Sequence, residues 1–267
     1  MKILFLGDIV GNVGCNAVKS NISNIIKTKK IDFVIVNGEN SYSTGVGITE
    51  NIANELFSCG IDVITTGNHV WDQKETFEHI QTEKRLLRPK NMSKDLPGNG
   101  FGIFLSKNGF KIGVLNLMGN VFMKKSDDVF QISKEFLSKY KLKQHYDFLV
   151  VDFHGEITSE KMAIGHFFDG MATMVVGTHT HVPTNDSRIL DNGTAYQTDA
   201  GMCGDYNSVI GMNKEYSLNK FLKISSGKKK PSEGEASICG VIVEADIKTG
   251  LAKNVDSFIY GGELNKK

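Results

Sequence analysis

The chain has 267 residues, of which 40% are hydrophobic and 23% are charged, and its formal net charge is +1. This composition excludes a disordered or membrane-embedded chain, and it provides no general electrostatic attraction for nucleic acid or a membrane surface. The length is sufficient for a sizeable buried core. We expect a single domain over residues 1–267.

The amino-terminal segment predicts no targeting signal. Only four apolar residues stand between Lys2 and Gly7, far fewer than a signal peptide or a membrane span requires. We therefore expect a cytoplasmic protein. The four cysteines lie far apart without a Cys-x-x-Cys motif, which favours buried or idle thiols over a zinc ribbon or a disulfide framework.

The first third of the chain alternates between predicted strands and helices. Its apolar runs end in glycine or polar residues, as buried strands do where they lead into loops. Strands are predicted over residues 2–6, 32–36 and 62–66, and helices over 15–29 and 50–58. A further helix is expected just after Asp72, because Asp72 and Glu75 have the spacing of a capping box.

From residue 101 onward, antiparallel pairing is expected. Asn108-Gly109 lies between the apolar segments 101–106 and 110–117 and is a strong hairpin signal. Residues 202–204, with Tyr206 and Asn207, are expected to form a loop over the substrate, because glycine allows close backbone approach. The other predicted elements are helices over 130–142 and 158–169, strands over 148–151, 174–176, 237–246 and 252–260, and an exposed loop over 225–235 with solvated lysines at 228–230.

Five predicted strands end in side chains that can bind a metal ion. His179 and His181 stand two residues apart, so on an extended backbone their imidazoles share a face. Alone, such a pair is more often two hydrogen-bonded histidines, and Asp8 alone could equally cap its loop. A metal site is favoured because the candidates gather at strand ends. They are Asp8, Glu39, Asn40, Asn68, His154, His179 and His181.

This set of donors indicates a pair of metal ions. Three imidazoles, two carboxylates and two carboxamides, with no thiol beside them in the sequence, suit borderline divalent ions such as iron, manganese or zinc. Glu39 is the expected bridge, because a carboxylate has two oxygens. Two ions about 4 Å apart can hold a hydroxide and neutralise a phosphoester during in-line attack. The predicted chemistry is phosphoester hydrolysis.

Six stretches of the sequence carry a resemblance to known proteins. They are residues 7–11, 37–40, 67–72, 153–156, 177–182 and 193–202. Their order and content resemble the calcineurin-like metallophosphoesterases, and more closely the YmdB family of bacterial phosphodiesterases. The resemblance runs over most of the chain, from residue 3 to about residue 212.

The resemblance implies an α/β fold, a four-layer α-β-β-α sandwich of two mixed sheets, with a dinuclear site at the loop edge. It implies a phosphodiesterase acting on cyclic nucleotides, 2′,3′-cyclic monophosphates among them, by attack of a metal-bound hydroxide. His69 would be the catalytic general acid that protonates the departing oxygen. Iron would be the favoured metal, with manganese or zinc as alternatives. One ion would be held by Asp8, Glu39 and His181, and the other by Glu39, Asn40, Asn68, His154 and His179.

The sequence departs from the broad superfamily at two positions. Val10 stands where a histidine is common, and Glu39 stands where aspartate is usual, a change that the YmdB group shares. One ion therefore has fewer protein ligands, which leaves room for water or substrate.

Two other functions compete with the enzyme. A non-catalytic nucleotide sensor or regulatory protein would keep the metal site, but it would not need His69 as a proton donor. An RNA-processing nuclease is disfavoured by the near-neutral charge, since surfaces that track phosphates are usually basic. The expected partner is a small phosphodiester or cyclic nucleotide, with neither a membrane nor stable nucleic-acid binding. The oligomeric state is left open, and a homo-oligomer could form through the hairpin at Asn108-Gly109 or through the final strands.

Overall fold

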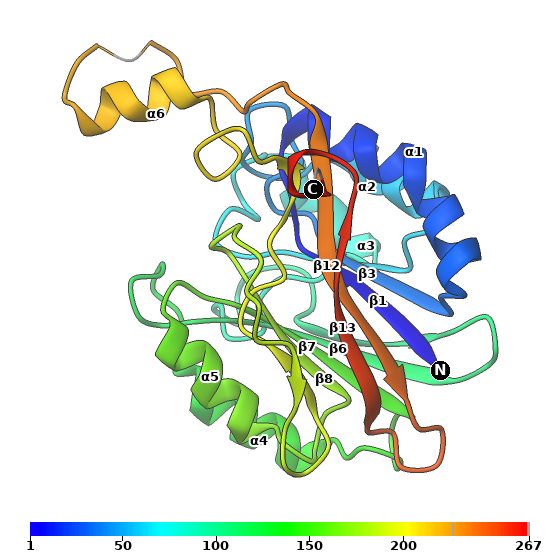
Figure 1. Cartoon of the computed structure of the whole chain (residues 1–267). Helices are drawn as coiled ribbons and strands as arrows, with labels where there is room; N and C mark the ends of the chain where they lie inside the picture. The colour runs from blue at the N-terminus through cyan, green and yellow to red at the C-terminus, as the bar shows by residue number, and fades with distance from the viewer. Residues whose placement is uncertain (226, 266–267) are drawn as a thin grey trace.

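The computed structural model describes residues 1–225 and 227–265. Two β-sheets face each other between two groups of helices (Figure 1). This arrangement confirms the expected four-layer α-β-β-α sandwich. One outer layer contains α1 (Gly11–Lys29), α2 (Glu50–Ser58) and α3 (Thr76–Thr82), and the other contains α4 (Val129–Lys139) and α5 (Thr158–Phe167).

The first sheet is mixed. Its strands are β1 (Lys2–Leu6), β2 (Asp8–Ile9), β3 (Phe33–Asn37), β4 (Val63–Thr65), β11 (Met202–Asp205), β12 (Ala236–Ala245) and β13 (Ala252–Tyr260). The order is β2-β11-β12-β1-β3-β4, with β13 also paired to β12. Strand β3 runs parallel to β1 and β4, whereas β12 runs antiparallel to β1 and β13.

The second sheet is also mixed. Its strands are β5 (Phe101–Leu105), β6 (Lys111–Met118), β7 (Phe148–His154), β8 (Met174–Thr178), β9 (Arg188–Ile189) and β10 (Ala195–Gln197). The order is β5-β6-β7-β8-β10-β9, in which the four central strands are parallel and the two edge strands are antiparallel.

The central strands of each sheet are buried on both faces, which explains the continuous apolar runs in the sequence. Along β1, Ile3 and Phe5 pack into the core between the two sheets, whereas Leu4 and Leu6 pack against the helical layer. The alternation follows from the two-residue period of a strand. Helices α4 and α5 cover the outer face of the second sheet through a third apolar cluster that includes Phe136.

The edge of the sandwich that holds the site is formed by the carboxyl ends of parallel strands. The loops after β1, β3 and β4 meet the ends of β7 and β8 there, because parallel strands deliver their following loops to one edge. Contacts across the two sheets join Asn68 to His154 and Asp8 to His179.

The structure differs from the sequence predictions in four elements, three of which lie in the body of the sandwich. Residues 202–205, expected in part as a loop over the substrate, form the buried strand β11, because Cys203 pairs with both Ile9 and Ile238. Helix α3 begins only at Thr76, because the Asp72 carboxylate contacts His69 instead of capping a helix. The short strand β2 was not predicted.

A sixth helix, α6 (Lys214–Phe221), was also not predicted, and it projects from the body of the molecule (Figure 1). Only Ser217 of this helix is buried, and the apolar residues Leu218 and Phe221 are exposed, so the eight-residue segment is too short for its pattern to reveal a helix. In the expected loop 225–235, residue 226 lies outside the described residues, and residues 227–230 are exposed. Within the described part of the chain, no helix combines the length and apolar character needed to cross a membrane.

Candidate metal centre

The seven candidate ligands converge at the carboxyl edge of the two sheets. Asp8 lies in β2, and Glu39, Asn40 and Asn68 lie in the loops after β3 and β4. The second sheet contributes the remaining three, namely His154 as the last residue of β7 and both His179 and His181 just after β8. Residues far apart in the chain therefore share one site.

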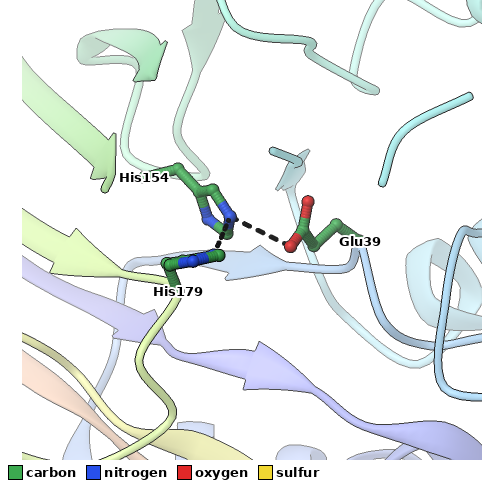
Figure 2. Close-up of side chains that lie close together, drawn as sticks. All are labelled: Glu39, His154 and His179. Carbon is green, nitrogen blue, oxygen red and sulfur yellow. Dashed lines mark hydrogen bonds and ion pairs between the residues drawn. The ribbon is translucent and has the colours of Figure 1, made fainter. Parts of the chain in front are cut away.

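The first group of donors surrounds the Nε2 atom of His154. This atom lies 2.9 Å from Glu39 Oε1, 3.0 Å from His179 Nδ1 and 3.1 Å from Asn68 Oδ1. Figure 2 shows how the side chains of Glu39, His154 and His179 point toward one another. Their potential ligand atoms all lie within 4.8 Å of one another, which is a suitable spacing for a shared metal ion.

The second group contains Asp8, Asn40 and His181. His181 Nε2 lies 3.3 Å from Asn40 Oδ1 and 3.9 Å from Asp8 Oδ1. Asn40 was expected in the group around His154, but its carboxamide oxygen lies beside His181. Asp8 is fully buried, and its Oδ1 atom has no hydrogen-bond partner among the described residues. A buried carboxylate oxygen without a partner is costly, so Asp8 suits a bound cation.

A hydrogen-bond chain behind His154 sets its tautomer. Thr178 donates its only hydroxyl hydrogen to Asp152 Oδ1 at 2.7 Å. Toward His154 Nδ1, which lies 2.9 Å away, the Thr178 hydroxyl oxygen can therefore only accept a hydrogen bond. The neutral imidazole then carries its hydrogen on Nδ1 and its lone pair on Nε2, inside the first group. Such outer hydrogen bonds are typical of metal-binding histidines.

The other two histidines are arranged in the same way. His181 Nδ1 lies 2.8 Å from the carbonyl oxygen of Ile210, and His179 Nε2 lies 2.9 Å from Glu156 Oε2. Both of these oxygens can only accept a hydrogen bond. The inner nitrogens, Nε2 of His181 and Nδ1 of His179, are therefore left with lone pairs that point into the site.

The facing lone pairs of His154 and His179 need positive charge between them. Burial alone would lower the pKa of His154, but the neighbouring Glu39 carboxylate outweighs it and raises that pKa to about 9. Burial alone would raise the pKa of Glu39, but the charge and hydrogen bond of His154 lower it to about 2. Burial and the His154 charge lower the pKa of His179 to about 3. When bound, a metal ion between the two imidazoles would supply that positive charge.

Gly67 provides the space in which these side chains meet. A Cβ atom at this position would collide with the imidazole of His154 and would lie 2.5 Å from Glu39 Oε2. Glu39 is further fixed by the backbone N–H of His69, which donates to Oε2 at 2.9 Å. The glycine that precedes Asn68 is therefore required by the close approach of the two sheets at this edge.

The backbone of the His-Thr-His turn is held in an unusual conformation. His179 has a φ of 96° and His181 a φ of 66°, in the left-handed region that non-glycine residues rarely adopt. The buried Asp199 Oδ2 accepts hydrogen bonds from the backbone N–H and the hydroxyl of Thr180, at 3.2 and 2.7 Å. Asp199 thus fixes the residue between the two histidines.

His69 lies on the rim of the site and belongs to neither group. Its Nδ1 is 2.6 Å from Asp72 Oδ2, and its side chain is 28% exposed. Lys124 Nζ is 3.6 Å from the other oxygen of Asp72 and donates to the carbonyl oxygen of Asn68 at 2.6 Å. His69 is therefore oriented by a carboxylate while its ring can reach a bound molecule.

A cavity of about 260 Å³ opens onto this site. This volume is close to the lower end of the range for small-ligand pockets. Lys229, which was expected to be solvated, lines it together with Glu39, Asn40, His69 and Met212. One wall therefore carries a positive charge opposite the candidate metal ligands.

Sequence reasoning missed five residues that shape the site. Asp72 was read as a helix cap, and Lys229 as part of a solvated run. Asp152, Glu156 and Thr178 lie next to or near the candidate histidines in sequence, and Glu156 and Thr178 fall inside the motif stretches 153–156 and 177–182, but no role was predicted for them. Their roles depend on contacts that form only in the folded protein.

Comparisons with known proteins agree with this geometry. A family model described as YmdB-like protein matches residues 4–258. The 2′,3′-cyclic-nucleotide 2′-phosphodiesterase of Bacillus subtilis (strain 168) is 40% identical over 263 residues, which cover 98% of each chain.

Two solved structures superpose on the whole chain. The crystal structure of a novel phosphatase from Mycoplasma pneumoniae matches with a TM-score of 0.90 and 36% identity, covering 98% of this chain and 93% of that one. A hypothetical protein from Thermus thermophilus matches with a TM-score of 0.90 and 35% identity, covering 98% and 100%. These similarities confirm the family resemblance and the fold class predicted from the sequence.

Proposed function

The chain belongs to the YmdB-like protein family, and from this premise we propose that it is a dinuclear metal-dependent phosphodiesterase acting on 2′,3′-cyclic nucleotides. The observation that carries the proposal is the pair of facing inner nitrogens of His154 and His179, together with the unpartnered Oδ1 of Asp8. The name of the Bacillus subtilis relative supports the choice of substrate.

The donors divide between two ions. We assign Asp8, Asn40 and His181 to one ion, and Asn68, His154 and His179 to the other, with Glu39 shared between them. Imidazole, carboxylate and carboxamide donors suit iron, manganese or zinc. We propose iron as the native metal, in line with the family resemblance. When bound, such a pair would activate a water molecule and neutralise charge on the phosphate.

The residues around the ions would position the substrate and move one proton. His69 would donate a proton to the departing 2′-oxygen, and Asp72 would hold its Nδ1 so that the other ring nitrogen faces the cavity. Lys229, on the cavity wall, would attract the substrate phosphate. Glu156 would keep His179 in the tautomer whose Nδ1 faces inward.

Hydrolysis assays on metal-depleted and reloaded protein test this function. The full chain would be stripped of metal, reloaded anaerobically with iron(II), manganese or zinc, and supplied with a chromogenic phosphodiester, a phosphomonoester or 2′,3′-cyclic nucleotides. We expect metal-restored cleavage of the diesters and the cyclic nucleotides. His154→Asn and Asp8→Ala should abolish turnover without unfolding the protein, whereas His145→Asn, at an exposed position, should not.

Two outcomes would favour other functions. If protein that contains two bound ions cleaves nothing with any metal, a non-catalytic nucleotide sensor becomes the better interpretation. Strong, salt-dependent RNA binding would instead support a nuclease, because phosphate contacts release counterions.

A further inference from the structure

A second cavity of about 370 Å³ lies against α4, away from the candidate metal centre. It is bounded by the segment 88–100 on one side and by α4 residues on the other, and it shares no lining residue with the metal-centre cavity. Four basic side chains line it together with a single acidic one. These are Arg88, Lys90, Lys94 and Lys139, with Glu135 as the acidic residue.

Arg88 carries a buried charge that no carboxylate among the described residues balances. Its side chain is 6% exposed, and it donates hydrogen bonds to the backbone carbonyls of Pro89, Leu96 and Pro97, at 2.9 to 3.1 Å. A guanidinium has more N–H donors than these contacts use. Within the described residues Arg88 forms no salt bridge, although a buried charge is costly without a counter-charge.

The lysines add to this unbalanced charge. Lys90 is half-buried. Its pKa is lowered mainly by this burial, and to a smaller extent by the positive charges of Arg88, Lys139 and Lys94. None of the three lysines has a salt-bridge partner in the part of the chain that the structure describes. The Glu135 carboxylate accepts a hydrogen bond from Gln131, one turn earlier on the same helix. The cavity therefore attracts an anion.

The cavity is also lined by apolar and aromatic side chains. Phe136 and Tyr140 are stacked, with ring centroids 5.1 Å apart and an interplanar angle of 26°, and Tyr140 is only half-buried. Ile132 on α4 and Leu96 on the segment 88–100 add further apolar surface to the lining. A ligand that fits this mixed lining combines an anionic group with a flat or apolar part.

We propose that this cavity is a binding site for a nucleoside monophosphate, with the phosphate held by Arg88, Lys90 and Lys139 and the base packed beside Tyr140. Guanidinium and ammonium groups are the usual protein partners of phosphate. The cavity volume lies within the range of small-ligand pockets. The site does not depend on the phosphodiesterase function, because none of the candidate metal ligands contributes to it.

Calorimetric titration of the metal-loaded full chain with adenosine monophosphate tests the proposal. The double variant Lys90→Met/Lys139→Met should bind about tenfold or more weakly, since it loses two charge-assisted contacts. Its hydrolysis of the chromogenic diester should be unchanged. Lys134→Met, which removes an exposed charge from the same helix outside the cavity, should bind as the wild type does.

Further comparisons separate this site from the metal centre. His154→Asn should retain the nucleotide binding that the double variant loses. Binding that is lost only in His154→Asn, or no saturable binding in the wild type, would overturn the proposal. Inorganic phosphate should bind more weakly than the nucleotide. Equal affinity of the two ligands would show that the base does not pack beside Tyr140.

Lysine acetylation of the wild-type protein gives a test that does not depend on how a variant folds. Adenosine monophosphate should protect Lys90 and Lys139 from acetylation and leave Lys134 as reactive as before, as read by mass spectrometry. Equal protection of all three lysines, or of none, would contradict the assignment.

Discussion

Lys161 Nζ lies 2.6 Å from Asp199 Oδ2, and both side chains are buried directly behind the turn that carries His179 and His181. The same carboxylate holds Thr180 through two hydrogen bonds, and its other oxygen accepts from the backbone N–H of Gly201 at 2.8 Å. The ion pair thus anchors a strained backbone whose histidines face the candidate metal centre. Its function is to position these histidines.

The first prediction concerns this anchor. Asp199→Ala should lower metal affinity by about 10- to 100-fold, because the turn loses the contacts that orient its histidines. It should also lower the free energy of unfolding by about 3–5 kcal/mol, since Lys161 is left buried without a counter-charge. Metal affinity would be measured by competition with a chelator, and stability by urea unfolding.

Two variants distinguish positioning from a general loss of stability. Thr180→Ser keeps the hydroxyl and should retain most of the metal affinity. Asp186→Ala removes a carboxylate that holds Thr198, farther along the same segment, and should leave metal binding intact. Unchanged metal affinity in folded Asp199→Ala protein would show that the ion pair does not position the turn.

The second prediction concerns Gly67. Gly67→Ala places a methyl group against His154 and Glu39, so it should abolish metal retention and activity while the circular dichroism spectrum is preserved. Metal content would be measured by elemental analysis of the purified protein.

Gly109→Ala is the matched control for that substitution. Nothing lies within 4 Å of a Cβ at Gly109, although its φ of 80° disfavours alanine. This control should lose roughly 1 kcal/mol of stability and keep its metal. A Gly67→Ala protein with full metal content would refute the proposed crowding.

The third prediction separates proton donation by His69 from metal chemistry. His69→Ala should reduce hydrolysis of a 2′,3′-cyclic nucleotide by about 10²- to 10⁴-fold, because its alkoxide leaving group needs a proton. The loss should be much smaller with a nitrophenyl diester, whose leaving group departs as an anion. Asp72→Asn should lower the hydrolysis rates of both substrates in the same pattern as His69→Ala but by smaller factors, since Asp72 acts through His69. Equal losses for both substrates, in protein with full metal content, would rule out the general-acid role.

The fourth prediction concerns the thiols. Burial raises the pKa of Cys15 to about 12 and that of Cys239 to about 11, and it raises the pKa of Cys203 as well. A raised pKa keeps the thiol protonated at pH 8, and alkylation requires the thiolate. Iodoacetamide should therefore label these three cysteines slowly in the native protein and readily after unfolding, as followed by mass spectrometry. Rapid native labelling of Cys203 would contradict its burial.

The sequence alone determined the principal strands and the polar residues that follow them. Apolar runs such as 2–6 and 32–36 are local signals, and two-sided burial makes them nearly continuous. The same local logic located the candidate ligands, because a strand that ends in a polar loop shows its boundary in the sequence. The motifs then predicted the family, which the comparisons confirmed.

Local patterns did not reveal elements that depend on distant partners. Strand β11 forms because its residues pair with Ile9 and Ile238, and neither partner is near it in the sequence. Helix α6 escaped prediction for a different reason, since it is short and its apolar residues Leu218 and Phe221 stay exposed instead of joining the core. Asp72 was misread because a capping carboxylate and one that binds a histidine can have the same sequence spacing.

Only the tertiary structure decided how the site residues are grouped and oriented. Asn40 meets His181 across 141 residues of chain, and Asn68 meets His154 across 86. The tautomer of His154 depends on Thr178, and that of His181 depends on the carbonyl of Ile210. The second cavity, lined by basic side chains, exists only where α4 packs beside Arg88. The periodicity of apolar residues in the sequence indicates which face of one helix or strand is buried. These contacts depend instead on how separate elements are placed in space. No local pattern in the sequence therefore encodes them.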